Sequence, residues 1–151
     1  MNKEDNININ VSAPNLISVC VDTSDHGEFS GRLYQCYEEE PWRYKNVVQL
    51  LRLMDNLYDI IAYPQASTES RSFVKKEKEP LQKLQKRVPQ DEILKQKGKV
   101  ATFVIYVQYR QNATWQGEVI WNDRELKQHF NSALELIKLI DSALGEYDIC
   151  Y

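Results

Sequence analysis

The chain repeats itself at a distance of 86 residues, and this repeat constrains the fold more than any other feature. When the sequence is shifted by 86 positions without a gap, Val21 aligns with Val107 and Gly31 with Gly117. Conservative matches fill the positions between these identities. We therefore predict two copies of one structural unit, each with the same local structure. The other identities that we use are Leu50 with Leu136, Leu53 with Leu139 and Asp55 with Asp141.

A β-hairpin is predicted near the start of each copy. In the second copy, apolar side chains alternate along residues 103–109 and again along 115–121, which is typical of half-buried strands. These two sets share one face only if the loop has an odd number of residues. We therefore expect the three-residue loop Gln111–Ala113, which would pair Tyr109 with Trp115. In the first copy the equivalent loop is Asp25–Gly27, where the glycine suits a left-handed backbone.

Each hairpin is followed by an amphipathic helix. Asn46 lies three residues before Gln49, and Ser132 lies three residues before Glu135, so a capping box begins both helices at the same repeat position. Apolar residues then recur at helical spacing. Between hairpin and helix, each copy has room for a third short strand. The predicted fold class is α+β: tandem duplicated ββ(β)α units with an antiparallel sheet or sheets, and one amphipathic helix per repeat on one face.

These assignments divide the chain into five segments. The two repeats occupy residues 15–63 and 100–145. A polar, Asn-rich tail covers 1–14 and a C-terminal tail covers 146–151. The connection between the repeats, 64–99, is interpreted as a basic linker that is partly helical or flexible, because a connection of this length inside a domain is either functional or mobile.

Composition and motifs argue against an enzyme. The chain of 151 residues is 42% hydrophobic, which is enough for a real core. No apolar run reaches the roughly 18 residues of a membrane-spanning helix. The first residues have no apolar stretch like that of a secretory signal, so we expect a cytoplasmic protein. The cysteines and the two histidines have no metal-ligand spacing, and no phosphate loop or nucleophile elbow is present. We predict no catalytic residue, no metal site and no cofactor.

The sheet face opposite the helices is the first candidate site. Alternation assigns Tyr106, Gln108 and Arg110 to this face, and Trp115 and Gln116 lie on the return strand. A mixed aromatic and amide surface is typical of protein interfaces. The same face also carries apolar residues, so we expect the middle segment, the C-terminal tail or a second subunit to cover part of it. The preferred hypothesis is a non-enzymatic binding or regulatory protein that uses these five residues for a protein partner or for self-association as a homo-oligomer.

A basic segment supports a second hypothesis, nucleic-acid binding. A three-stranded sheet on one helix, with the pattern Trp115-x-Gly117-x-Val119, resembles AP2-type DNA-binding domains, and the resemblance implies Arg and Trp contacts from the exposed sheet face. Acidic residues offset the basic ones there, so the segment between the repeats is the main argument. A third hypothesis is an enzyme or a receptor for a small, nucleotide-like ligand, with its site between the repeats. The nine basic residues are Lys75, Lys76, Lys78, Lys83, Lys86, Arg87, Lys95, Lys97 and Lys99.

Overall fold

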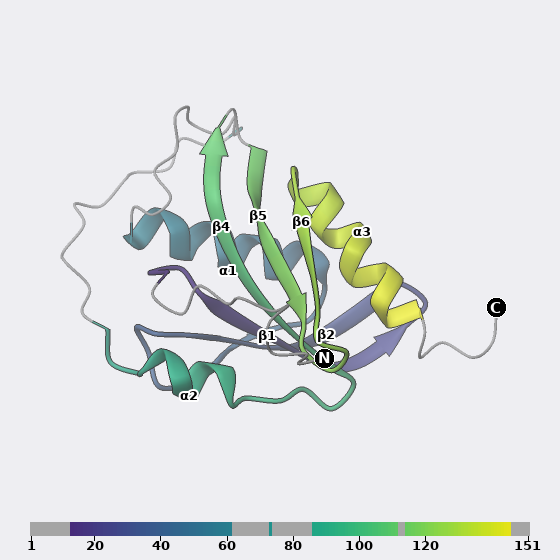
Figure 1. Ribbon diagram of the computed structural model, residues 1–151, viewed down its shortest axis with the longest axis horizontal. Coiled ribbons are helices and arrows are strands. Elements are labelled where there is room, and N and C mark those ends of the chain that lie inside the picture. Colours follow the sequence, from purple (N-terminus) through teal and green to yellow (C-terminus); the bar gives the residue numbers. More distant parts are fainter. Residues whose placement is uncertain (1–12, 62–72, 74–85, 112–113, 146–151) are drawn as a thin grey trace, which may run out of the picture.

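A computed structural model describes residues 13–61, 73, 86–111 and 114–145. The elements are β1 (Ile17–Asp25), β2 (Glu28–Gln35), β3 (Trp42–Tyr44), α1 (Val47–Ile61), α2 (Gln90–Leu94), β4 (Ala101–Gln111), β5 (Thr114–Trp121), β6 (Leu126–Phe130) and α3 (Ala133–Leu144). The six strands form one antiparallel sheet in the order β3-β2-β1-β4-β5-β6 (Figure 1). The α+β class is confirmed, and the two halves share one sheet that joins at β1 and β4.

The element order strand, strand, strand, helix occurs twice, with α2 between the two occurrences. Both third strands are present. We call β1–β3 with α1 the first half, and β4–β6 with α3 the second half. The strand β2 begins at Glu28 and β5 begins at Thr114, which keeps the offset of 86 seen in the sequence. Within the described residues, no helix is long and apolar enough to cross a lipid bilayer.

Both long helices pack on the same face of the sheet, and capping boxes begin both of them, as predicted. The Asn46 side chain accepts a hydrogen bond from the Gln49 amide at 2.9 Å, and the Ser132 hydroxyl accepts one from the Glu135 amide at 3.0 Å. Each helix buries one stripe of apolar side chains against the sheet, and together these form the main core. The buried helical residues are Leu50, Met54, Leu57 and Tyr58 in α1 and Leu136, Ile140, Ala143 and Leu144 in α3.

A β-bulge interrupts both hairpins at the same repeat position. Val107 pairs with Gly117, but Tyr109 pairs with Gln116, so Gln108 is an extra residue in β4. Asp22 is the equivalent extra residue in β1. Because side chains alternate strictly along a strand, one extra residue inverts which side chain faces the core. The expected pairing of Tyr109 with Trp115 is therefore wrong.

The alternation of apolar side chains predicts one extra residue in the hairpin loop. That extra residue lies in the bulge of the strand instead. Asp25 pairs with Glu28, which leaves a two-residue loop, His26-Gly27. Both loop residues have positive φ, 46° and 94°, as a type I′ turn requires. The expected three-residue loop of the first hairpin is therefore also wrong. In the second hairpin Gln111 pairs with Thr114, and residues 112–113 lie outside the described residues.

The opposite face of the sheet has a smaller apolar cluster of its own. Tyr106 and other side chains from β4 and β5 are buried there beneath Ala13 and Leu16, and Leu94 of α2 packs against them. The Asn15 side chain fastens this cover by donating a hydrogen bond to the Val107 carbonyl at 2.6 Å. In Figure 1, α2 lies on the side of the sheet away from α1. Of the three expected covers, the middle segment is thus found on this face, and Ala13 and Leu16 lie over it as well.

Candidate functional site

Tyr106 and Trp115, two of the five predicted partner-binding residues, belong to the protein interior. Tyr106 is 3% exposed, and its hydroxyl donates a hydrogen bond to Glu118 Oε1 at 2.6 Å. Burial also raises the pKa of this hydroxyl. Trp115 is 7% exposed and meets the ring of Tyr58 edge-on at 5.4 Å between centroids. Neither side chain offers much surface to a partner in this conformation.

Arg110 lies on the helix face of the sheet, not on the opposite face as its sequence position suggested. The bulge at Gln108 is the physical reason, because it inverts the alternation just before Arg110. The guanidinium is 5% exposed and donates hydrogen bonds to Asp59 Oδ1 at 2.9 Å and to the Tyr58 carbonyl at 3.2 Å. It also lies 3.6 Å from Asp55 Oδ1. Arg110 therefore ties the end of α1 to β4.

The remaining two predicted residues, Gln108 and Gln116, do reach the surface. Gln108 is exposed and Gln116 is half-buried. Tyr109, which sequence reasoning placed in the core, is 55% exposed beside them. These three side chains lie on an open strand surface and not in an enclosed site. Their role in partner binding stays a prediction.

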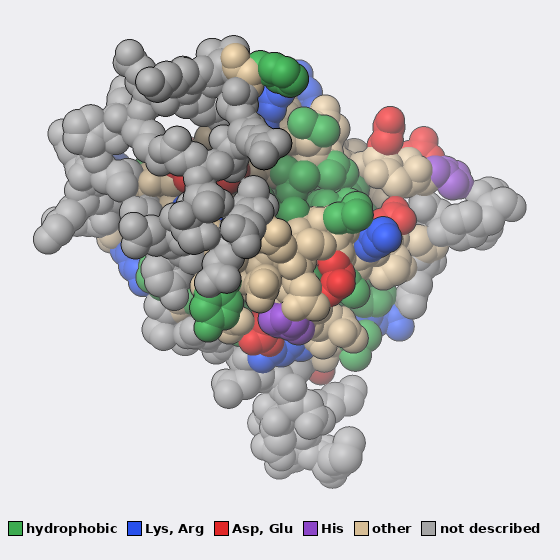
Figure 2. Space-filling model, turned by 90° about the horizontal axis from the view of Figure 1, so that it is seen from above, with side chains coloured by type: hydrophobic (Ala, Val, Ile, Leu, Met, Phe, Trp, Pro, Cys, Tyr) green, Lys and Arg blue, Asp and Glu red, His purple; other side chains and the backbone are tan. Residues whose placement is uncertain are grey.

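The basic segment is only partly described. Lys86, Arg87, Lys95, Lys97 and Lys99 are exposed, and Lys75, Lys76, Lys78 and Lys83 lie outside the described residues. On the face in Figure 2, described basic side chains are scattered among acidic ones instead of forming one positive field. Nucleic-acid binding stays a prediction. It would be checked by an affinity that falls steeply as salt concentration rises.

A partly buried ion pair between Arg32 and Asp22 holds the end of this basic segment against the sheet. Arg32 donates to both carboxylate oxygens of Asp22, at 2.8 and 3.1 Å, and also to the Lys97 carbonyl at 2.8 Å. The Lys99 amide donates to Asp22 Oδ1 at 3.1 Å. The hydrogen bond from Arg32 is the main reason why the pKa of Asp22 lies below its ordinary value.

Asp22→Asn should flatten the acid dependence of stability. Because folding lowers the pKa of Asp22, the carboxylate stabilises the folded state above its unfolded pKa of about 3.9, and this contribution is lost as pH falls through the folded pKa. Urea unfolding measured between about pH 6 and about pH 3 should therefore show a smaller loss of stability in the variant than in the wild type. An identical loss in both proteins would contradict this assignment.

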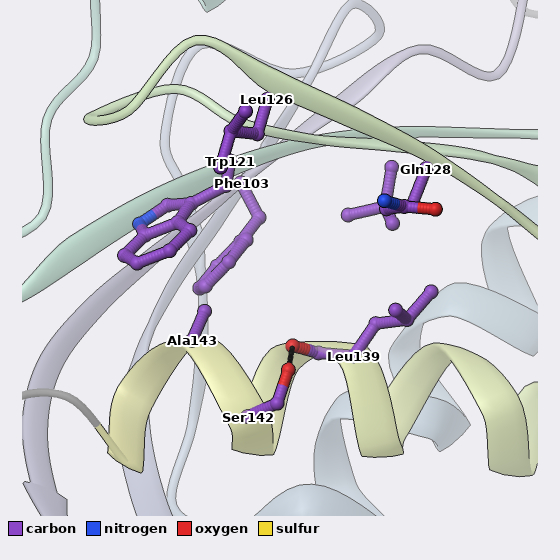
Figure 3. Close-up of a pocket in the computed structure, with 8 residues that line it drawn as sticks. Phe103, Trp121, Leu126, Gln128, Leu139, Ser142 and Ala143 are labelled. Carbon is purple, nitrogen blue, oxygen red and sulfur yellow. Dashed lines mark hydrogen bonds between the residues drawn. The ribbon is translucent and has the colours of Figure 1, made fainter.

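A groove lies between α3 and the last two strands, with a volume of about 230 Å³. Figure 3 shows side chains of β6 on one side of the groove and side chains of α3 on the other. The walls are mostly apolar. The Ser142 hydroxyl donates to the Leu139 carbonyl at 2.7 Å, and the Gln128 amide extends over the cavity. The lining residues are Phe103, Val119, Trp121, Leu126, Gln128, Leu139, Ser142 and Ala143.

Comparison of the two halves explains this groove. Gln128 stands where the first half has Trp42, and Ala143 stands where it has Leu57. In the first half, the Trp42 ring packs against the main core and Leu57 is fully buried. The two larger apolar side chains thus fill space that an amide and a methyl group leave open. At a third pair of equivalent positions the larger side chain is in the second half, where Trp121 corresponds to Gln35. The groove nevertheless remains beside Trp121.

The two edges of the sheet also differ. The strand β3 has three residues, follows Pro41 and the acidic run Glu38–Glu40, and exposes Arg43. Short length, proline and charge are the usual means of preventing an edge from pairing with another chain. The strand β6 has five residues and exposes Leu126 (55%) next to the groove. Within the described residues, β6 pairs with β5 on one side, and no strand pairs with the other side of β6.

The described residues contain no group of three or more His, Cys, Asp and Glu side chains placed to hold a metal ion. Cys20 and Cys36 are free thiols, and burial raises the pKa of both, which makes them poor nucleophiles. His26 lies 2.6 Å from the Asp25 carboxylate, and His129 lies 3.1 Å from the Asn131 side chain. The groove and the adjacent β6 edge are the candidate site that the following proposal considers.

Comparison with protein-family models, with curated proteins and with solved structures finds no match for this chain. Sequence reasoning missed this site, although one signal was available: the exchange of Trp42 for Gln128 at equivalent repeat positions.

Proposed function

We propose that the protein is a non-enzymatic protein-interaction module that binds an extended polypeptide strand at β6. The observation that carries this proposal is a sheet edge that no described strand pairs with, beside an apolar groove, at positions where the first half has a short, charged edge and filled space. Strand addition obtains affinity from main-chain hydrogen bonds and specificity from pockets that receive alternate side chains. A strand paired with β6 would direct every second side chain towards the groove.

The size and chemistry of the groove favour a peptide side chain over a metabolite. Pockets for small molecules usually have volumes of about 300–1,000 Å³ and several convergent polar groups. The groove is smaller, about 230 Å³, and Gln128 and Ser142 are its two polar lining residues. This comparison favours protein binding over the small-ligand alternative.

We further propose that the two halves arose by duplication of one βββα unit. The shared element order, the bulges at Asp22 and Gln108 and the paired capping boxes support this origin. In this view the first half retains a structural role. The second half has lost the tryptophan that fills the equivalent space and has acquired a binding role.

A double variant that closes the groove tests the proposed function. Gln128→Trp with Ala143→Leu installs the residues that fill the same space in the first half, so the fold should tolerate them. Wild-type protein and the variant would each select from a random peptide library displayed on phage. We expect the wild type to enrich extended sequences with alternating apolar residues, and the variant to bind those peptides at least tenfold more weakly.

The control for this experiment is Leu134→Ala, because Leu134 is an exposed apolar residue of α3 that does not line the groove. This variant should bind the selected peptides like the wild type. Circular dichroism and thermal melting would verify that all three proteins are folded. A monomeric wild type that enriches no peptide, or equal binding by the closed variant, contradicts the proposed function.

A further inference from the structure

We infer that the strand bound at β6 is β6 of a second copy of this chain, so that two sheets join edge to edge in a two-fold dimer. This inference rests on the proposed function and names the partner. The reason for choosing a second copy is that β6 is complementary to itself in antiparallel pairing, as the following positions describe.

On the helix face, pairing centred on Gln128 matches residues of the same kind, and on the opposite face it sets Lys127 against His129 of the partner subunit. It places Leu126 opposite Phe130 of the partner subunit, so apolar residues meet on the helix face. Gln128 then lies opposite Gln128 of the partner subunit. A carboxamide carries both donors and an acceptor, so two of them can hydrogen-bond to each other across the axis. Leu126, which is now more than half exposed, would lose water contact.

The charges of β6 do not oppose this pairing. Lys127 is the strand's single lysine or arginine, and its ammonium lies 2.7 Å from Glu118 Oε2 on the neighbouring strand β5. Both side chains of this pair are largely buried, with 26% and 19% exposed. An edge lysine prevents pairing when its charge would have to be buried alone. Here the charge is already neutralised within the same subunit.

The contrast between the two edges explains why such an assembly would stop at two copies. An interface that uses the same patch on both subunits closes with two-fold symmetry. After β6 has paired, the remaining outer edges are the β3 strands, with three residues each behind Pro41 and close to Glu38–Glu40. These edges resist further addition, so the joined sheet would be a closed dimer and not a growing fibre.

Sedimentation equilibrium of the full chain between about 1 and about 100 μM tests the inference, a range that brackets a micromolar dissociation constant. We expect a monomer–dimer equilibrium for the wild type. Gln128→Lys should weaken the dimer at least tenfold, because two ammonium groups would then meet at the axis without partners. The control is Arg43→Lys, a charge-conserving change at the exposed β3 edge, which should leave the equilibrium unchanged. Thermal melting would show whether Gln128→Lys remains folded.

Disulfide trapping gives a second, position-specific measurement. Directly opposed residues of an antiparallel pair have Cα atoms about 4.5–5.5 Å apart, which a disulfide can span. Gln128→Cys in a Cys150→Ser background should therefore form a covalent dimer on mild oxidation. Arg43→Cys in the same background should not, because β3 remains an outer edge. Cys20 and Cys36 are buried and should contribute little background.

The outcomes separate this inference from the proposed function. A wild type that is monomeric throughout but still selects groove-dependent peptides overturns the dimer and leaves strand binding intact. A dimer that is unaffected by Gln128→Lys, and is not trapped through residue 128, also overturns the inference. A monomer that selects no peptide removes both proposals.

Discussion

Gly117→Ala should lower the free energy of unfolding by about 3 kcal/mol or more, the upper range for overpacking against a rigid neighbour. A Cβ atom at this position would run into the Tyr106 carbonyl oxygen and would lie 2.8 Å from Val107 Cα. Both obstacles are backbone atoms of β4 beside the bulge, so no side-chain rotation relieves the clash. The strands β4 and β5 would have to separate locally, and their hydrogen bonds would be lost. Urea unfolding followed by circular dichroism measures the effect.

Two other glycines supply the comparison for this variant. Gly31 is the equivalent residue beside the first bulge, and its added Cβ would meet the Cys20 carbonyl, so Gly31→Ala should be similarly destabilising. Gly27 has a φ of 94°, but its nearest neighbour would be Asp141 Oδ1 at 3.7 Å. Gly27→Ala should therefore cost only about 1 kcal/mol of backbone strain. A Gly117→Ala protein as stable as Gly27→Ala would refute the close approach at the bulge.

Arg110→Ala should destabilise the protein by about 2–3 kcal/mol. Removing one partner of a fully buried ion pair typically costs about 3–5 kcal/mol. We expect less here because Asp55 and Asp59 are 36% and 57% exposed and can be solvated by water after the change. What remains is the loss of the buried arginine stem and of the donor to the Tyr58 carbonyl.

Comparison with milder substitutions identifies the source of this effect. Arg110→Met keeps most of the buried stem and removes the charge, so it should be less damaging than Arg110→Ala. Asp59→Asn leaves an acceptor next to the guanidinium and lies at the surface, so it should change stability by less than about 1 kcal/mol. If Asp59→Asn were as damaging as Arg110→Ala, the ion pair and not the packing of the stem would dominate.

The element order could be predicted from sequence because it depends on short-range patterns. Capping residues such as Ser132 and Glu135 signal a helix start within four residues, and alternation signals a strand within eight. The repeat made each signal visible twice. The three-residue loop expected for the second hairpin also pairs Ile105 with Val119, and this pairing is confirmed because the extra residue of the bulge has the same effect on the register.

The bulges were missed because nothing local distinguishes them. Gln108 and Asp22 fit an unbroken alternating strand as well as a bulged one. A three-residue loop would also bring the apolar side chains of both strands to one face, so the sequence does not distinguish the two cases. One visible clue was the glycine at equivalent positions of the two halves. Gly31 and Gly117 each lie directly across from the residue that precedes the bulge, where the backbones approach too closely for a side chain.

The burial of Tyr106 depends on contacts between residues far apart in the chain. Its cover comes from Ala13 and Leu16, at the boundary of the predicted N-terminal tail, and from Leu94 in the predicted linker. Alternation assigns a residue to a face, but it does not say whether another segment covers that face. For this reason the predicted surface wrongly includes Tyr106, whereas Arg110 is buried because the bulge turns it to the helix face.

The two long helices reach beyond their own halves. The end of α1 contacts Arg110 in the second half, and Asp141 of α3 lies beside the Gly27 turn in the first half. Each half thus depends on the other to complete its packing, although each carries a full set of elements. A protease cut between them should yield two fragments that reassociate, and intact chains should melt in a single cooperative transition. Excision of either half as an independent mini-protein should fail.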